Sequence, residues 1–432
     1  MLFFDSILRV YNSVISPPIT PRKRDDAIRI GLIGASTIAP FAVITPAKSH
    51  PDVIVAAVAA RDINRAEAYA RRYDIPVVHS TYQALLEDPS IDAVYIALPN
   101  SYHYEWSLRS VQAGKHVLLE KPSCSNATEA KKLFKHPLIT APNAPVLLEA
   151  FHYQFHPAWQ TFLTQVHQSP GSIESVSSQF YLPRLLLGKD DIRFKYSLAG
   201  GCLMDVATYC VSSVRQIVGR QIRLTPVNID HRPLSISSNE EPQIDEAVTA
   251  TFLTPNSQIV RIQGDLASAG GWFSLLPASW TKALPTLRWP MSEAVFEPVL
   301  VESIVQEDGV PLQHVFKRTV RIWNHMIPYI YHRIDTSDQH TLQRGEEVIR
   351  SWNETSYKKA YNWPSGDKRA AVYKDWWSTY RCQLEEFVNK IKGRQGSGVW
   401  IDGEESIAQM ETIDRAYEKA GLGPRPTSNF EI

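Results

Sequence analysis

Short apolar runs alternate with amphipathic stretches over residues 28–151. Runs of small and β-branched residues without polar interruption predict strands buried on both faces, as in IRIGLIG (28–34), VIVAAVAA (53–60) and IDAVYIAL (91–98). Stretches of helical composition, such as INRAEAYARRY (63–73), separate them. Strands that alternate with helices of this length predict a Rossmann-type α/β domain, in which a parallel sheet carries helices on both faces.

The pattern changes beyond residue 160. Polar and apolar residues alternate in SIESVSSQFYL (172–182), QIDEAVTATFL (243–253) and QIVRIQGDL (258–266), which is typical of strands with one solvated face. A helical stretch, LMDVATYCVSSVRQIVG (203–219), interrupts them. These segments predict a second, α+β domain built on a large, open and mostly antiparallel sheet.

The predicted organisation has three parts: an N-terminal helix and linker (1–26), a Rossmann domain (27–155) and an α+β domain (156–432). The last part includes an aromatic-rich insertion at about 270–370 and C-terminal helices over 375–421. Residues 272–377 hold eight of the eleven tryptophans. Such a concentration indicates a core or a subunit interface, with a membrane-binding or sugar-stacking surface as the alternative.

The N-terminal stretch MLFFDSILRVYNSVIS has apolar residues at helical spacing and polar residues on the other side. It lacks a cationic start and contains Asp5 and Arg9, so it is a poor signal peptide, and it is too short to span a bilayer. We expect an amphipathic helix packed on its own protein or on a sister subunit. A helix lying on a membrane surface is the alternative. The expected location is cytoplasmic.

Composition narrows the range of partners. The 45 basic and 45 acidic residues cancel, so no charge excess points to nucleic acid or to an anionic membrane. The four cysteines are scattered, without the spacing of a metal site, and fit free thiols in a reducing compartment: Cys124, Cys202, Cys210 and Cys382. A length of 432 residues fits two domains.

A turn suited to a dinucleotide follows the first strand. The run Gly34-Ala35-Ser36-Thr37-Ile38 occupies the place of the G-x-G-x-x-G fingerprint, although only its first glycine is present. Small residues there let the backbone approach a pyrophosphate at a helix N-terminus. The second strand ends in Arg61, and an arginine at this point suits a 2′-phosphate, so we expect NADP rather than NAD. The alternative is an exposed Arg61 paired with Asp62.

The strand at 116–120 runs into Glu120, Lys121 and Pro122, a charge pair at the sheet edge where α/β domains bind ligands. The motif AGKHVLLEKP occurs in order with GLIGASTIA, AARD, IDAVYIALPNSYHYEW, LLEAFHYQFHP and AGGCLMDVATY. With these segments, the chain resembles the glucose–fructose oxidoreductase / inositol dehydrogenase (Gfo/Idh/MocA) family. Within it, the chain is similar to the NADP-dependent D-xylose dehydrogenase and dihydrodiol dehydrogenase branch. The matching segments cover most of residues 28–220.

The resemblance implies a catalytic set. Lys121 reaches the oxygen on the reacting carbon, Glu120 helps to hold the nicotinamide end of the site, and Tyr209 is the acid/base. Asp205 lies four residues before Tyr209 on the predicted helix, so both side chains share one face. Asp205 is expected to hold a sugar hydroxyl or to keep Lys121 charged and oriented. The Lys121 ammonium is expected to lower the pKa of Tyr209 from ~10 and so make it a base.

Further site residues are expected from their places in the same motifs. The loop that covers the nicotinamide ribose in the family adds four residues to the cofactor site: Leu98, Pro99, Asn100 and His103. The substrate side adds His152, Tyr153 and Arg193 to Lys121, Asp205 and Tyr209. Relatives commonly carry Arg where this chain has Gln154, which indicates a missing ionic contact near the cofactor. The histidines have irregular spacing, so no metal site is expected.

These observations predict an NADP-dependent enzyme that transfers hydride between nicotinamide and a sugar hydroxyl, with D-xylose or a similar aldose as the first candidate. A trans-dihydrodiol or cyclic-polyol dehydrogenase would use the same residues. From a different class, a catalytically silent NADP-binding scaffold or sensor stays open. The family commonly pairs its open sheets face to face, so the resemblance implies a homodimer. We expect no nucleic-acid partner and no membrane association.

Overall fold

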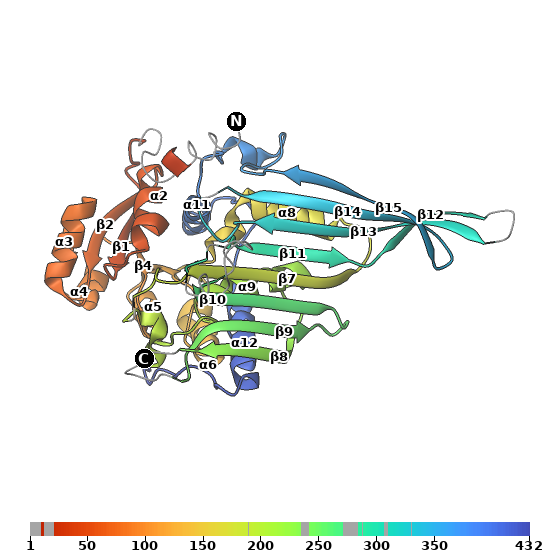
Figure 1. Cartoon of the computed structure of the whole chain (residues 1–432). Coiled ribbons are helices and arrows are strands. Elements are labelled where there is room, and N and C mark those ends of the chain that lie inside the picture. The colour runs from red at the N-terminus through yellow and green to blue at the C-terminus, as the bar shows by residue number, and fades with distance from the viewer. Residues whose placement is uncertain are drawn as a thin grey trace.

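The computed structural model describes residues 10–12, 21–188, 190–234, 242–270, 284–286, 288–305, 310–329 and 331–432. The helix predicted for the N-terminus lies almost entirely outside these residues and stays a prediction. The described chain forms two sheets with helices packed against them (Figure 1). The predicted fold class, a parallel Rossmann-type sheet followed by a large and mostly antiparallel sheet, is confirmed.

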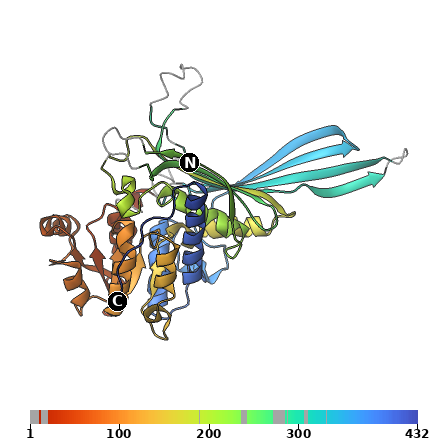
Figure 2. The same ribbon diagram turned by 90° about the horizontal axis from the view of Figure 1, so that it is seen from below.

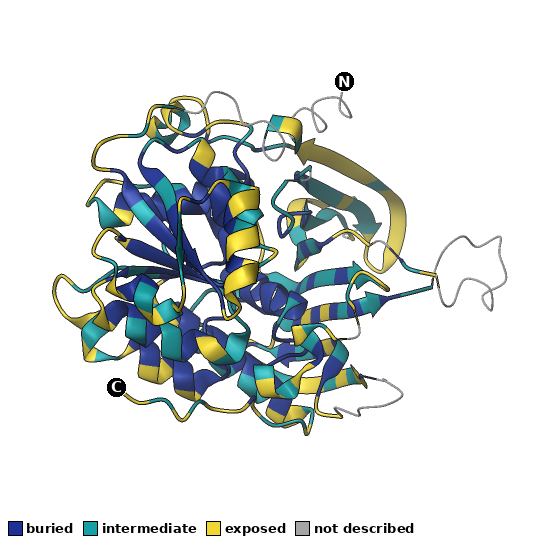
Figure 3. Ribbon diagram, turned by 90° about the vertical axis from the view of Figure 1, so that its left-hand side faces the viewer, coloured by how far each residue is buried: buried dark blue, intermediate teal, exposed yellow. Residues whose placement is uncertain are grey.

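The first sheet has six parallel strands in the order β3-β2-β1-β4-β5-β6. They are β1 (Ile28–Ile33), β2 (Val53–Ala59), β3 (Val77–His79), β4 (Ala93–Ile96), β5 (His116–Leu119) and β6 (Leu147–Glu149). Figure 3 shows these strands buried between helices that are exposed on their outer sides. The strand order reverses between β1 and β4, and the carboxyl ends of these two strands open the crevice in which such sheets bind ligands.

The helices of this half are α2 (Thr45–Lys48), α3 (Ile63–Tyr73), α4 (Tyr82–Glu87), α5 (His103–Gln112), α6 (Ala127–Phe134) and α7 (Pro137–Thr140). Side-chain caps begin several of them; for example, Thr81 caps α4 and Asn126 caps α6. After the Gly34 turn the chain is helical without interruption over residues 39–48, as a π-helical turn, Pro40–Ile44, that continues into the short α2. Pro46 has no backbone donor for the preceding turn, which fits the change of hydrogen-bonding pattern.

Among the described residues, the second sheet has nine strands: eight in the order β15-β14-β13-β11-β7-β10-β9-β8, and β12 beside β13. They are β7 (Ile173–Pro183), β8 (Thr225–Pro233), β9 (Asp245–Leu253), β10 (Ile259–Ser268), β11 (Met291–Phe296), β12 (Val299–Val305), β13 (Pro311–Trp323), β14 (Arg333–Arg344) and β15 (Glu347–Lys358). Among the described strands of this second sheet, only β7 and β10 pair in parallel. Helices α8 (Pro157–His167), α9 (Val206–Val218) and α12 (Gly403–Lys419) cover one face.

Strands β12–β15 extend beyond these helices as a projecting arm (Figure 2). Strands β8 and β11–β15 are not among the strands predicted from the sequence. β8, β12 and β15 are largely exposed and carry no clear apolar alternation, whereas β11 does bury one face, with Ala294 and Phe296 in the core. The aromatic-rich region contributes partly to the core, as predicted: Trp363 and Trp377 are buried. In the arm, Trp352 stacks on His340 with ring centres 4.9 Å apart.

Helix α11 (Thr379–Ile391) returns from the second half to pack on the first. The chain just beyond it is fixed by Asp52, which lies 2.9 Å from the Lys392 ammonium and 2.8 Å from the Arg394 guanidinium. Ser378 caps the start of α11 by accepting a hydrogen bond from the Arg381 amide. The first residues of α11, including Tyr380, therefore reach the crevice between the two sheets. The domain boundary predicted at residue 155 stays a prediction.

Candidate active site

A cleft of about 740 Å³ lies between the carboxyl ends of the first sheet and the start of the second half. Its cofactor-side lining includes Ser36, Thr37, Ile38, Leu98, Asn100, His103 and Glu120. Its opposite side includes Lys121, His152, Arg193, Asp205 and Tyr209, with an apolar wall formed by residues 180–183, Leu186, Ile192 and residues 326–329. The structure thus brings together most of the residues predicted from separate motifs.

The loop after β1 is held by α3. Gly34 has a φ of 105°, and a Cβ on it would lie 3.1 Å from the carbonyl oxygen of Ala97. Arg65 donates to the carbonyl of Ala35 at 2.9 Å, and the Tyr69 hydroxyl donates to the carbonyl of Ser36 at 2.9 Å. Gly34 and Ala35 shape this turn without lining the cleft, while the next three residues line it.

Arg61 is exposed just after β2, and the structure assigns its acidic neighbour a different task. The Asp62 carboxylate caps α3 by accepting from the amides of Asn64 at 2.9 Å and Arg65 at 3.3 Å. Helix capping thus explains the position of Asp62 without the Arg61–Asp62 pair that the sequence left open. An exposed guanidinium at the end of the second strand fits a 2′-phosphate, as the sequence predicts.

One buried histidine lies between the turns after β4 and β5 and, as a neutral imidazole, donates to one of them. His103 Nδ1 lies 2.8 Å from the carbonyl oxygen of Pro122, and its Nε2 lies 2.9 Å from that of Leu98. Burial lowers the pKa of His103 to about 4. On the same side, Asn100 donates to the carbonyl of Ala199 at 2.9 Å. His103 and Asn100 therefore fix the loops around the cleft, and Pro99 does not line it.

The Glu120-Lys121-Pro122 turn places its two charges in different surroundings, and its Lys121–Pro122 peptide bond is cis. Glu120 is buried and accepts a hydrogen bond from the Tyr95 hydroxyl at 2.6 Å. Burial raises the pKa of Glu120. The Lys121 ammonium instead reaches across the cleft and lies 2.8 Å from Asp205 Oδ1.

Asp205 is held between two cations. Besides Lys121, Arg193 donates from Nε to the second Asp205 oxygen at 2.6 Å, and Arg193 also contacts Asp191 at 3.0 Å. Burial acts against ionisation, but the charges of Arg193 and Lys121 lower the pKa of Asp205 well below its ordinary value. Both carboxylate oxygens are thus engaged. Of the two roles expected for Asp205, this geometry matches the one that keeps Lys121 charged and oriented.

Tyr209 lies on α9, one turn after Asp205, and its hydroxyl lies 3.1 Å from His152 Nε2. The Lys121 ammonium lies over its ring, 4.9 Å from the centre. Burial raises the pKa of Tyr209 well above its ordinary value, and the charges of Glu120 and Asp205 act in the same direction. This direction is opposite to the one expected from the sequence, because burial dominates the pKa of Tyr209. The Lys121 charge lies over the ring.

Two predicted features differ in the structure. Tyr153 is fully buried, does not line the cleft, and shares a hydrogen bond of 2.8 Å with Ser212. Gln154, where an ionic contact was expected to be missing, lies in the core and donates to Glu405 at 3.0 Å. The 3₁₀ turn His152–Phe155 explains the difference, because it directs only its first side chain to the cleft.

Sequence reasoning missed several cleft residues from the C-terminal half. Tyr380 lines the cleft from α11, and its ring lies 4.1 Å from that of His152. Tyr329 donates from its hydroxyl to the carbonyl of Phe41 at 2.8 Å, which joins the two halves at the edge of the cleft. No local motif marks these positions. Only long-range packing brings them to the site.

The described residues contain no group of three or more His, Cys, Asp or Glu side chains placed to hold a metal ion. None of the helices they form is long and apolar enough to cross a membrane.

Known proteins share these features. A model of the Gfo/Idh/MocA oxidoreductase family, described by its NAD-binding Rossmann fold, matches residues 28–137. D-xylose 1-dehydrogenase (NADP(+)) 2 of Haloferax volcanii is 38% identical over 240 residues, which are 54% of this chain and 72% of that protein. Trans-1,2-dihydrobenzene-1,2-diol dehydrogenase of Mus musculus is 31% identical over 202 residues, which are 45% of this chain and 57% of that protein.

Solved structures support the same architecture. A 3-ketoreductase from Actinomadura kijaniata in complex with NADP and TDP-benzene aligns with a TM-score of 0.62 at 20% identity, over 90% of this chain and 96% of that one. An aldose-aldose oxidoreductase from Caulobacter crescentus aligns with a TM-score of 0.64 at 15% identity, over 91% and 98% of the two chains. With its matching family model and its Haloferax relative, the chain belongs to the Gfo/Idh/MocA family of oxidoreductases with an NAD-binding Rossmann fold.

Proposed function

We propose that the protein is an NADP-dependent oxidoreductase that interconverts a hydroxyl and a carbonyl group on a sugar, with D-xylose or a similar aldose as the first candidate. One observation carries the proposal: Lys121, Asp205 and Tyr209 meet in the same cleft as the dinucleotide loop after β1. The Haloferax relative, named for oxidation of D-xylose with NADP(+), supports the choice of substrate and cofactor.

The residues present fit a dinucleotide. The cofactor side of the cleft offers the Ser36 hydroxyl, next to a glycine turn. Arg61 does not line the cleft, but it is exposed at the end of β2 and supplies a cation suited to a 2′-phosphate. A bound nicotinamide dinucleotide supplies or accepts the hydride in such an enzyme. The protein's own groups bind the substrate, orient it and move the proton.

Each side chain has a defined task in this proposal. Lys121, fixed by Asp205, directs an ammonium N–H to the oxygen of the reacting carbon and stabilises negative charge that develops there. Tyr209 is protonated at neutral pH because burial raises its pKa, so it gives its proton to a carbonyl oxygen during reduction. In oxidation the same hydroxyl proton returns to Tyr209. Arg193 holds the second oxygen of Asp205 and so completes the orientation of Lys121.

A cyclic trans-diol is a second candidate substrate, and the apolar wall of the cleft favours it. Phe180, Leu182, Leu186, Met326 and Ile327 line the substrate side. The tyrosine hydroxyls along this wall already have hydrogen-bond partners. Tyr181 donates to Gln263, and Tyr329 donates to the main-chain carbonyl of Phe41. A sugar hydroxyl placed there without a partner costs about 1–3 kcal/mol. A ring with two hydroxyls and an apolar edge fits this wall.

Assembly and location stay proposals. The face of the second sheet that α8, α9 and α12 leave uncovered is the surface on which we propose that a second copy of the chain pairs. It is polar and already carries ion pairs along its strands, such as Arg321 with Glu293 and Lys317 with Glu174. We retain a cytoplasmic location and propose no nucleic-acid or membrane partner.

Turnover of purified full-length protein tests the function. The near-ultraviolet absorbance of the reduced nicotinamide is followed with NADP or NAD against D-xylose, other aldoses, inositols and cyclic trans-diols, and with the matching lactones and ketones in reverse. NADP-dependent turnover of an aldose that Lys121→Ala and Tyr209→Phe both abolish supports the proposal. Tight NADP binding without turnover of any substrate supports the silent scaffold instead.

A further inference from the structure

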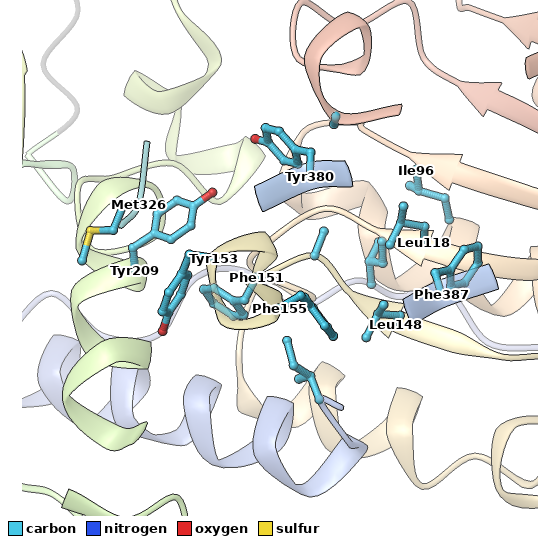
Figure 4. Packing of buried hydrophobic residues seen from close by; sticks show 14 of the residues in the cluster. Ile96, Leu118, Leu148, Phe151, Tyr153, Phe155, Tyr209, Met326, Tyr380 and Phe387 are labelled. Atoms are coloured by element: carbon cyan, nitrogen blue, oxygen red, sulfur yellow. The ribbon is translucent and has the colours of Figure 1, made fainter. Parts of the chain in front are cut away.

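The oxygen of Tyr209 lies against neutral groups. The Lys121 ammonium is committed to Asp205 at 2.8 Å and faces the Tyr209 ring, not its oxygen. The phenolic oxygen instead lies 3.1 Å from His152 Nε2 and hydrogen-bonds to the Tyr380 hydroxyl. Figure 4 shows the hydroxyls of Tyr209 and Tyr380 pointing toward one another. A phenolate formed at this buried oxygen therefore depends on these two neighbours.

The Tyr380 hydroxyl carries a proton that it can donate to the Tyr209 oxygen. Burial raises the pKa of both phenols, and against this background their hydrogen bond lowers the pKa of Tyr209 and raises that of Tyr380. A hydrogen bond has these opposite effects when one hydroxyl donates and the other accepts, because donation stabilises the accepting oxygen as an anion. The pair is enclosed: Tyr209 is 6% exposed and Tyr380 is 3% exposed. Water therefore has little access to replace the donor.

His152 is the second neighbour, and its other nitrogen is anchored. His152 Nδ1 lies 2.7 Å from the Thr379 hydroxyl, and the imidazole is 1% exposed. Burial, followed by the charge of Lys121, lowers the pKa of His152 to about 3, so the ring is neutral and carries one N–H. When the Thr379 hydroxyl donates to Nδ1, that N–H lies on Nε2 and points at Tyr209.

We propose that His152 and Tyr380 are positioning residues, two neutral donors that hold the Tyr209 oxygen and stabilise it as a phenolate. The inference rests on the proposed function for the reaction itself. In reduction, the Tyr209 O–H bond breaks and its proton passes to the carbonyl oxygen as the carbonyl carbon accepts hydride from the reduced nicotinamide. The electron pair stays on the phenolic oxygen. In oxidation, the same oxygen takes the proton of the substrate hydroxyl.

Kinetics of the full-length enzyme with NADP test the proposal. Replacing the imidazole in His152→Leu, or the hydroxyl in Tyr380→Phe, is expected to lower kcat roughly 100-fold with little change in KM, as for the loss of one preorganised donor. The pH at which alcohol oxidation reaches half its maximal rate moves upward by about one unit or more. His152→Gln keeps an N–H near the Nε2 position and restores most of the rate.

Tyr373→Phe is the matched control, because it removes another buried tyrosine hydroxyl, one that donates to Glu386 at 2.7 Å outside the cleft. It is expected to leave the pH profile unchanged. Profiles of His152→Leu and Tyr380→Phe that coincide with that of the wild type, while Tyr209→Phe is inactive, overturn the proposal. An equal loss in His152→Gln and His152→Leu points to a merely structural role and also overturns it.

A spectroscopic measurement separates this inference from the proposed function. Nitrogen NMR of the histidines in the wild-type protein reports which ring nitrogen of His152 carries the proton, with His152→Gln used for assignment. We expect Nε2–H, changing toward Nδ1–H in Thr379→Val. A wild-type Nδ1–H form refutes the donor geometry even if turnover is found. If the Nε2–H form is present but no substrate is turned over, the proposed function is contradicted, while the donor geometry of His152 is supported.

Discussion

The Lys121 ammonium lies 4.9 Å from the centre of the Tyr209 ring, above its face, and does not meet the Tyr209 hydroxyl. From the sequence, Lys121 was expected both to contact the substrate oxygen and to lower the pKa of Tyr209. The structure separates these two tasks. In the proposed mechanism the cation, held by its ion pair with Asp205, faces the substrate oxygen, and the phenol keeps its proton in a buried pocket. The site therefore combines a fixed positive charge with a neutral proton donor, a pairing suited to carbonyl reduction.

Removing the Lys121 charge tests the first half of this arrangement. In Lys121→Ala, kcat for either direction is expected to fall roughly 100- to 1000-fold, because the developing negative charge on the reacting oxygen loses its donor. Binding of NADPH, measured by its fluorescence, changes much less. The exposed Lys48 on the first half gives the matched control, Lys48→Ala, which retains wild-type kcat. Full activity in Lys121→Ala removes Lys121 from the mechanism.

The protonation of Tyr209 predicts how rate depends on pH. Because burial raises its pKa, Tyr209 stays protonated through neutral pH, and the kcat of carbonyl reduction is flat there. Oxidation requires the deprotonated oxygen, so its kcat rises as pH increases through the alkaline range. Tyr209→Phe removes this rise along with roughly 100-fold or more of the rate. Stopped-flow measurement of the hydride step at several pH values checks both directions, and a reduction rate that falls across neutral pH refutes the assignment.

The sequence predicted the first half more fully than the second for a physical reason. Buried parallel strands such as β1 and β2 read as continuous apolar runs, and their carboxyl ends locate a site without further information. Tyr380 could not be found in this way, since it follows Lys121 by more than half of the chain and only the packing of α11 places it. Tyr153 was predicted to line the site and instead points into the core. Its place next to a site motif did not reveal the direction of its side chain.

The exposed Arg61 predicts the choice of cofactor. A guanidinium that contacts a 2′-phosphate contributes a charge-assisted hydrogen bond, so Arg61→Ala is expected to raise the KM for NADP about 10- to 100-fold. The KM for NAD changes little, because NAD lacks that phosphate. Arg71→Ala, which removes an exposed arginine of α3 that is paired with Glu67, is the control. Equal effects of Arg61→Ala on both cofactors mean that Arg61 does not read the 2′-phosphate.

Asp205 links the site to stability at low pH. Its folded pKa lies below its ordinary value of about 3.9, so it contributes stability above that pH and loses this contribution as pH falls through the folded pKa. In Asp205→Asn, Lys121 and Arg193 lose their common partner. The free energy of unfolding is therefore expected to fall by about 3 kcal/mol at neutral pH. The difference from wild type narrows in acid. Chemical denaturation at neutral and acidic pH measures it, and a constant difference contradicts the ion-pair account.

Glu149, which lies beneath the active site, is expected to change stability with pH in the opposite direction to Asp205. It follows the apolar part of β6, is 1% exposed, and accepts a hydrogen bond from the Ser123 amide at 2.8 Å, just beyond the Lys121 turn. Burial raises the pKa of Glu149 to about 7. The folded protein therefore binds a proton that the unfolded chain has released between pH about 4.3 and about 7, and stability falls as pH rises through this window.

The substitution Glu149→Gln keeps an oxygen for the Ser123 amide and removes the ionisable group. It is expected to make the protein more stable than wild type above pH about 7, by up to roughly 3 kcal/mol, and equal to it near pH about 4. Glu297→Gln, at an exposed position, has no such pH-dependent effect. Thermal unfolding of the three proteins across this pH range decides the matter. A variant that is less stable than wild type at alkaline pH shows that the ionised carboxylate is needed to hold the turn that carries Lys121.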